Sequence, residues 1–359
     1  MPALAAGSVS LRLYPHDDQR ARDRRRAAGA GHTRDQIARL GNEVIGGGCA
    51  TPSDPGRAPP PRVSAVGQLG IVLGGGGVVG VAWETGVLAA LHDAGLTPLD
   101  DATMVVGTSA GSLVASHALQ GTSLAELEAI QHDPLPAHLT NTPEPDLNLL
   151  GELFTVWTTA TEITEAIATR LCELALRAPT ISEDDLLATL ANRLSSDWPD
   201  RSLLVTSVAC SSGQRVVWSS ASGVDLRRAV ASSCSVPGLF PPVTVDSASD
   251  ERYVDGGLWS GTNADLVLDA GLEAVIVIET MSVVNGQLGT LSTRTLDREV
   301  TALEAAGVRV ATVSPGPAYR DLGPHLMDPA RRADGLKLGR DDGAAAIATV
   351  SAFLENTTE

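Results

Sequence analysis

The chain has 359 residues, of which 43% are hydrophobic but only 3% aromatic, so aliphatic side chains must form most of the core of one large domain or two small ones. A total of 26 Lys and Arg against 43 Asp and Glu gives a formal net charge of −17, which argues against a nucleic-acid partner, because phosphate binding needs clustered cations. The cysteines form no C-x-x-C pair and no Cys/His cluster, so neither a metal site nor a disulfide framework is indicated.

The N-terminal part of the chain differs in composition from the rest. Residues 1–66 include the Arg-rich run 20–26 and the Pro-rich stretch 51–62, and such a segment buries too little apolar surface to offset the entropy lost on ordering. We therefore expect a disordered extension over 1–66 and a folded domain over 67–359. No apolar run is long enough to span a bilayer, and charge follows the short apolar start, unlike in a secretory signal. We expect a cytoplasmic protein without a transmembrane segment, and leave open a peripheral attachment to membranes.

From residue 68 onward, short apolar runs alternate with helical patterns. Helices are expected at 79–94 and 110–119, and a mainly helical covering segment at about 123–200, interrupted by a Pro-rich break at 133–145. Strands are expected at residues 69–73, 104–106, 202–209, 214–218, 274–278 and 308–313. This alternation predicts an α/β protein with three α/β/α layers and a central, mostly parallel sheet.

A glycine-rich loop joins the first strand to the first helix. Its glycines, Gly74 to Gly77 and Gly80, lack Cβ atoms, so successive backbone N–H groups can turn toward one anion at the positive end of the helix dipole. The spacing also fits a dinucleotide fingerprint, which by itself is a weak indication. A dinucleotide site needs an acid at the end of the next strand, whereas Asp100 and Asp101 precede that strand. The pattern therefore favours an anion hole of another kind.

Ser109 lies in a G-x-S-x-G element, Gly107 to Gly111, between the second apolar strand and an apolar helix. In this context the serine occupies a strained turn, its Oγ projects above the end of the strand, and flanking glycines avoid steric clashes. Ser109 is therefore the candidate nucleophile. A serine hydroxyl needs a base to become reactive.

Two residues are candidates for that base. His325 follows both Ser109 and an acid, in the Ser…Asp…His order of the α/β-hydrolases. Asp255 lies at the end of a short strand in YVDGG, where a carboxylate can accept the serine proton directly and glycines let a substrate approach. A plain Asp-Gly turn explains the same residues equally well, so these patterns alone leave the choice open.

The three motifs taken together resemble the patatin-like phospholipase family. An LGGGGxxG loop, a GTSAG turn and a late DGG occur in the family's order, and Ala231–Val243 is similar to the small-residue, proline-rich segment before its catalytic acid. The resemblance covers roughly residues 69–353. It implies a Ser–Asp dyad without histidine, in which Ser109 is the nucleophile and Asp255 the proton acceptor.

The resemblance also assigns roles to the glycines. It implies an oxyanion hole formed by the backbone of Gly75, Gly76 and Gly77, and supporting roles in the motifs for Gly80, Gly107, Gly111, Gly256 and Gly257. The family usually has Arg or Lys where this chain has Val79, which leaves the preferred head group open.

The implied function is hydrolysis of carboxylic esters of lipids, by a phospholipase A or lipid esterase that forms a covalent acyl-enzyme and needs neither metal nor organic cofactor. The expected partner is a lipid or another acyl ester. Whether the protein meets this substrate at a membrane surface stays open, as does its oligomeric state. One alternative is an α/β-hydrolase-type esterase with a Ser109–Asp255–His325 triad. The other is a catalytically weak, lipid-binding regulatory module.

Overall fold

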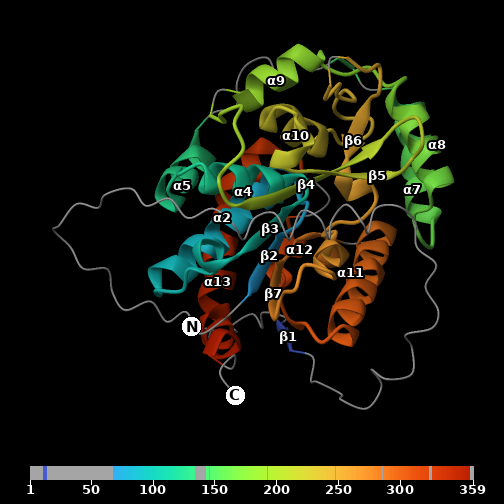
Figure 1. Cartoon of the computed structure of the whole chain (residues 1–359). Helices are drawn as coiled ribbons and strands as arrows, with labels where there is room; N and C mark the ends of the chain where they lie inside the picture. Colours follow the sequence, from blue (N-terminus) through green and yellow to red (C-terminus); the bar gives the residue numbers. More distant parts are fainter. Residues whose placement is uncertain are drawn as a thin grey trace, which may run out of the picture.

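The computed structural model describes residues 11–13, 68–133, 143–144, 146–191, 193–246, 248–284, 286–322 and 326–355. These residues form three layers, with helices on both faces of one mostly parallel sheet (Figure 1), so the predicted fold class is confirmed. Of the predicted disordered extension only Leu11–Leu13 is described, and the rest of 1–66 lies outside the described residues. Its disorder therefore stays a prediction. Among the described residues no helix has both the length and the apolarity needed to cross a bilayer.

The sheet is built around strands that are buried on both faces. In spatial order its strands are β1 (Leu11–Leu13), β8 (Arg309–Val313), β7 (Ala274–Ile278), β2 (Leu69–Leu73), β3 (Met104–Gly107), β4 (Ser202–Ala209) and β5 (Arg215–Trp218), and β6 (Tyr253–Asp255) also pairs with β4. The strands from β8 to β4 are parallel, while β1, β5 and β6 run antiparallel to their neighbours. Every residue of β2 and β7 is buried, as continuous apolar strands of a covered parallel sheet should be.

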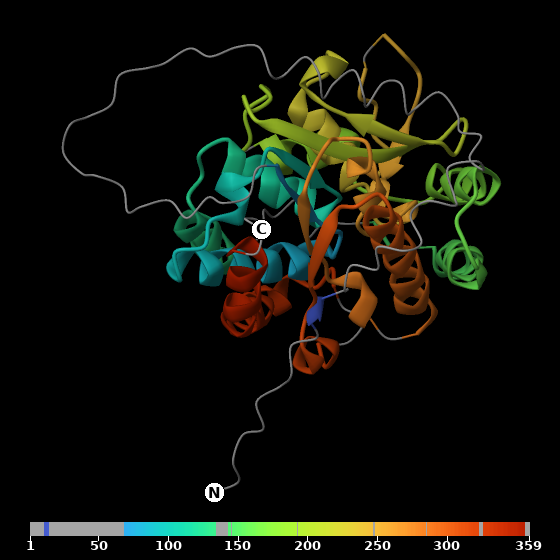
Figure 2. The ribbon, with the colours of Figure 1, turned by 60° about the horizontal axis from the view of Figure 1, so that its bottom comes forward.

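Helices cover the two faces of the sheet. The described helices are α2 (Gly77–Asp93), α3 (Pro98–Asp101), α4 (Ala110–Leu119), α5 (Leu124–His132), α7 (Leu147–Thr159), α8 (Glu165–Ala175), α9 (Glu183–Ala191), α10 (Leu226–Ser233), α11 (Gln287–Ala305), α12 (Pro317–Arg320) and α13 (Arg332–Glu355), with short 3-10 helices η2 (Ser220–Ser222), η3 (Gly256–Leu258), η4 (Ala264–Val267), η5 (Met281–Val283) and η6 (Pro329–Arg331). Helices α2 and α13 lie on one face and α11 on the other (Figure 2). Alternating side chains of β2 serve both faces, because Ile71 packs with Trp83 of α2 whereas Val72 packs with Val300 of α11.

The predicted covering segment at 123–200 does not form a single layer. Helix α5, which starts with a capping box between Ser123 and Glu126, packs beside α2 and α13. Helices α7 and α8 pack against each other, and α7 also packs against α11. Helix α9 packs against α10, at the top of Figure 1. The sequence predicted a helical segment here, but its local pattern does not specify which part of the sheet each helix covers.

Helix α13 approaches α2 closely through glycines spaced one helical turn apart. A Cβ atom at Gly339 would lie 2.1 Å from the carbonyl oxygen of Trp83, and one at Gly335 would lie 2.9 Å from a Cγ atom of Val79. The Trp83 indole N–H also donates a 2.8 Å hydrogen bond to Asp342 of α13. No larger residue fits these positions unless the two helices separate.

Replacing Gly339 with alanine should therefore destabilise the protein by about 1–3 kcal/mol, since the added methyl group meets the backbone of α2. Gly151 of α7 is the matched control, because it is exposed and a Cβ atom there meets nothing within 4 Å. Gly151→Ala should stabilise by about 0.5–1 kcal/mol through helix propensity. Urea unfolding of both variants checks this, and equal effects would contradict the close packing of α13 on α2.

Candidate active site

Ser109 lies at a sharp turn between β3 and α4, as its sequence context predicts. Its backbone has φ 51° and ψ −114°, a conformation that L-residues rarely adopt and that persists only when neighbours hold it. The turn also needs glycine at both ends. A Cβ atom at Gly111 would lie 2.1 Å from the carbonyl oxygen of Leu73, and one at Gly107 would lie 2.5 Å from the Cα of Ser112.

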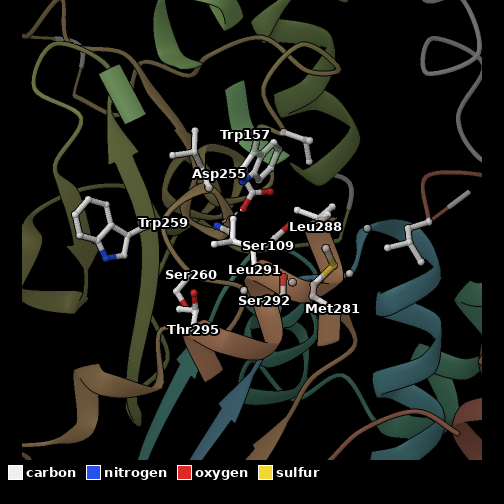
Figure 3. A pocket seen from close by; sticks show the side chains of 18 of the residues that line it. Ser109, Trp157, Asp255, Trp259, Ser260, Met281, Leu288, Leu291, Ser292 and Thr295 are labelled. Atoms are coloured by element: carbon white, nitrogen blue, oxygen red, sulfur yellow. Dashed lines mark hydrogen bonds between the residues drawn. The ribbon is translucent and has the colours of Figure 1, made fainter. Parts of the chain in front are cut away.

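Asp255 is the last residue of β6, and its side chain meets that of Ser109. The Ser109 hydroxyl faces the Asp255 carboxylate and lowers its pKa, and this carboxylate also accepts the Gly257 N–H at 2.7 Å. Figure 3 shows the two side chains next to each other in the pocket. Both are buried, with 6% and 4% of their surfaces exposed. Burial raises the pKa of Asp255 to about 7, against the opposing effect of the hydrogen bonds from Ser109 and Gly257.

The glycine-rich loop lies beside Ser109, and its amides are not equivalent. A Cβ atom at Gly75 would lie only 3.5 Å from the Cβ of Ser109. The Gly75 N–H donates to the carbonyl oxygen of Gly261 at 2.8 Å, and the Gly75 carbonyl accepts the Thr280 hydroxyl at 2.7 Å. The amides of Gly76 and Gly77 have no hydrogen-bond partner among the described residues. Gly77 has φ +63° and opens α2, so these two amides lie at the positive end of the helix dipole.

Asn263 joins the turn that carries Ser109 to the loop that follows Asp255 through side-chain hydrogen bonds. This fully buried residue, with φ 53°, donates to the hydroxyl of Thr108 at 3.0 Å and to the carbonyl oxygens of Ser260 at 2.8 Å and Gly256 at 3.4 Å. No sequence pattern predicts this residue, because a lone Asn beyond the DGG motif has no periodicity that distinguishes it. The signal that could have found it is the polar run SGTN in an otherwise apolar region.

The remaining motif glycines support this arrangement to different degrees. A Cβ atom at Gly256 would lie 2.2 Å from the hydroxyl of Thr206, and one at Gly257 would lie 2.9 Å from the Asp255 carboxylate, so neither position admits a side chain. A Cβ atom at Gly80 would make only an ordinary 3.5 Å contact with Ala110. Gly80 is therefore the least constrained of the predicted supporting glycines.

A cavity of about 180 Å³ opens at Ser109 and Asp255. Its lining is mostly apolar and includes Phe154 and Trp157 from α7, Leu258 from η3, Met281 from η5, and Leu288 and Leu291 from α11. Figure 3 shows Trp157, Met281, Leu288 and Leu291 around the two polar side chains. Helix α7 was predicted to be part of a covering layer, and the structure shows that it is also a wall of this cavity. Nothing in its local sequence distinguishes an apolar face turned to a cavity from one turned to the core.

Val79 does not face the cavity. It is fully buried in the core between α2 and α13, and its backbone N–H donates to the carbonyl oxygen of Leu326. The described residues that line the cavity include no Lys or Arg.

The sequence also suggested a dinucleotide site and a triad with His325. Strand β3 ends at Gly107 without an acid, while Asp100 and Asp101 lie in α3 before it, so the loop lacks the ribose-binding carboxylate of a dinucleotide site. Of the seven histidines, His92, His117 and His132 are described, and none of them lines the cavity. His325 lies outside the described residues.

Solved structures of several proteins resemble this chain at low similarity. VipD from Legionella pneumophila is 14% identical, with a TM-score of 0.40, and the match covers 79% of this chain and 67% of that one. Human GIVD cytosolic phospholipase A2 is 12% identical, with a TM-score of 0.45, and the match covers 99% and 66%. ExoU from Pseudomonas aeruginosa is 17% identical, with a TM-score of 0.31, and the match covers 77% and 53%. The chain thus spans about half to two thirds of the length of these proteins.

A comparison with families gives a more definite result. Among curated proteins, none matches the chain in sequence. The family described as patatin-like phospholipase, however, matches residues 71–268, which is more than half of the 359 residues and includes Ser109, Asp255 and the glycine-rich loop. The chain therefore belongs to the patatin-like phospholipase family.

Proposed function

We propose that this protein is a serine acyl hydrolase that cleaves carboxylic esters of lipids through a Ser109–Asp255 dyad. The observation that carries the proposal is that these two buried side chains lie next to each other at the opening of a mostly apolar cavity. Membership in the patatin-like phospholipase family supports a lipid hydrolase, and the geometry supports the residues. The domain that carries the activity is proposed to span residues 67–359.

In the first half of the reaction, Ser109 Oγ attacks the ester carbonyl carbon while the Asp255 carboxylate takes its proton. The amides of Gly76 and Gly77 hold the negative charge that develops on the carbonyl oxygen, and the α2 dipole adds to this stabilisation. Because the Gly75 amide already donates to Gly261, we assign the oxyanion hole to Gly76 and Gly77 rather than to all three glycines. The carbon–oxygen bond to the alcohol then breaks, and Asp255 returns the proton to the leaving oxygen.

In the second half, Asp255 takes a proton from a water molecule that attacks the acyl-enzyme. The bond between the acyl carbon and Ser109 Oγ breaks, the serine is reprotonated and the free acid leaves. A carboxyl group with a pKa of about 7 suits this alternation, since it exchanges protons in both directions near neutral pH.

The cavity favours the acyl part of the substrate over a charged head group. Its volume of about 180 Å³ lies below the roughly 300–1,000 Å³ of typical ligand sites, so it holds a segment of an acyl chain and not a whole lipid. Its described lining contains no cation that could pair with a phosphate. We therefore propose uncharged acyl esters, and the tail of a lipid, as the part of the substrate that enters.

Ser109→Ala should abolish both hydrolysis and labelling by a fluorophosphonate, because the nucleophile is lost. Asp255→Asn should lower kcat by about 10²–10⁴-fold, since an amide cannot accept the serine proton. A panel of p-nitrophenyl esters and phospholipid vesicles provides the assay. Ser116→Ala is the control, because Ser116 is also buried and lies on α4 but is not part of the site. Full hydrolysis by Ser109→Ala would refute the proposed function, and a folded wild-type protein that no probe labels would favour a regulatory module.

His325→Ala separates the dyad from the triad. If Asp255 accepts the proton directly, the variant should keep kcat/KM within about threefold of wild type. If His325 is the base, the loss should reach about 10³-fold or more, as for other triads. Single-turnover hydrolysis of an activated ester measures the difference. The test is relevant because Leu326 and Met327, which follow His325 in the sequence, line the cavity.

The pH dependence follows from the raised pKa of Asp255. The ionised carboxylate is the active form, so kcat/KM should be constant well above pH 7 and fall about tenfold per pH unit well below it. A profile that stays flat down to pH 5 would contradict the assignment of the base.

The same shift predicts how stability depends on pH. A carboxyl group whose pKa is raised on folding contributes stability below its ordinary pKa near 4, and that contribution is lost as the pH rises to about 7. The Asp255→Asn variant has no titratable carboxyl group at this position. Its melting temperature relative to wild type should therefore rise between pH 4 and 7 and level off above.

A further inference from the structure

The segment Ser233–Ser235, at the end of α10, contacts the backbone of both members of the proposed dyad. The Ser233 hydroxyl accepts the backbone N–H of Ser109 at 2.9 Å. Two residues later, the carbonyl oxygen of Ser235 accepts the backbone N–H of Asp255 at 2.9 Å. One short, covalently continuous stretch thus lies between two catalytic candidates that are far apart in the sequence. It belongs to the small-residue, proline-rich segment Ala231–Val243.

The contact with Ser109 occurs where the chain is strained. Ser109 has φ 51°, and its backbone N–H donates to the Ser233 hydroxyl. The Ser109 carbonyl oxygen is held too, since it accepts the Ser112 hydroxyl at 2.7 Å and the Cys234 thiol at 3.4 Å. Because strained conformations persist only when their surroundings hold them, these contacts fix the direction in which Oγ points.

The contact with Asp255 fixes the other side of the pair. Asp255 is held on its backbone by Ser235, and the Ser235 hydroxyl in turn donates to the carbonyl oxygen of Pro241 at 2.5 Å. Ser233 and Ser235 are both fully buried, so water does not compete for these bonds. The distance between Ser109 and Asp255 is therefore set through three consecutive residues.

We propose that Ser233 is a positioning residue that holds Ser109 at hydrogen-bond distance from Asp255, with Ser233–Ser235 as the spacer between the two. The proposal rests on the proposed function, since it assigns a role within that dyad. A dyad is sensitive to this spacing, because no imidazole lies between nucleophile and base to adjust. A misplacement of about 1 Å in a reacting group can lower the rate about 10²-fold.

The test compares Ser233→Ala with Ser232→Ala. Ser232 is the preceding residue on α10 and is also fully buried, but its hydroxyl bonds Ser207 and the carbonyl oxygen of Ala229, each at 2.7 Å, and not Ser109. Both variants lose one buried hydroxyl, so their melting temperatures should fall by similar amounts. Ser233→Ala should lower kcat about 10- to 100-fold with KM unchanged, whereas Ser232→Ala should keep kcat within about twofold of wild type.

The pH profile provides a readout that a purely structural role would not move. The Ser109 hydrogen bond lowers the pKa of Asp255, so a looser contact should shift the acidic limb of kcat/KM to higher pH in Ser233→Ala. The titratable group that faces Asp255 on this segment is Cys234, whose pKa burial raises to about 12, so the thiol stays neutral across the profile. Ser232→Ala should keep the wild-type limb.

The outcomes are distinguishable. If Ser109→Ala is inactive but Ser233→Ala and Ser232→Ala match in kcat and in pH profile, the positioning role is refuted while the dyad stands. If Ser109→Ala is active, the proposed function itself fails. Should Ser233→Ala unfold, Ser233→Cys replaces it, since a thiol is a weaker acceptor of similar shape. The kcat of Ser233→Cys should lie below wild type with a shifted limb, and a wild-type value of both would overturn the proposal.

Discussion

The contact between Ser109 and Asp255 is direct, buried and made by residues from distant parts of the chain. A carboxylate deprived of water needs hydrogen bonds to stay ionisable near neutral pH, and Asp255 receives them from the serine hydroxyl and from the Gly257 amide. The contact between Ser109 and Asp255 therefore depends on the position of each segment that neighbours them. Asn263 joins the Ser109 turn to the Asp255 loop from behind, and the end of α10 joins them along the backbone.

In the glycine-rich loop, some backbone N–H groups hold the loop in place and others remain available as donors. The Gly74 N–H extends the sheet by donating to Ile278 at 2.9 Å, and the Gly75 N–H donates to Gly261, so these two amides hold the loop in place. Gly76 and Gly77 follow at the start of α2, where the first N–H groups of a helix have no partner within it. The helix start beside Ser109 thus leaves backbone donors available, and the strand end before it holds the loop rigidly.

The sequence predicts the central strands and Ser109 because both depend on local order. The apolar runs of β2 and β7 are continuous, and glycines frame the serine at fixed spacing. The helices α10, α11 and α13 were not predicted, since α11 carries polar residues on most of its surface and α13 contains glycines that normally weaken a helix. Ser233 and Asn263 were missed for another reason. Ser233 and Asn263 each contact a residue far away in the sequence, Ser109 and Thr108, and no local spacing encodes such contacts.

The C-terminal segment explains why residue 79 can be apolar here. Val79 lies against Gly335 of α13, its N–H bonds Leu326, and a Cβ atom at the neighbouring Gly77 would lie 2.6 Å from the Met327 sulfur. Close packing therefore braces the start of α2, where relatives in the family usually carry a cation. A charged side chain in this fully buried place would need a partner to offset its desolvation, and the tight approach of Gly335 leaves little room for one. The bracing of the loop in this chain thus depends on helix packing.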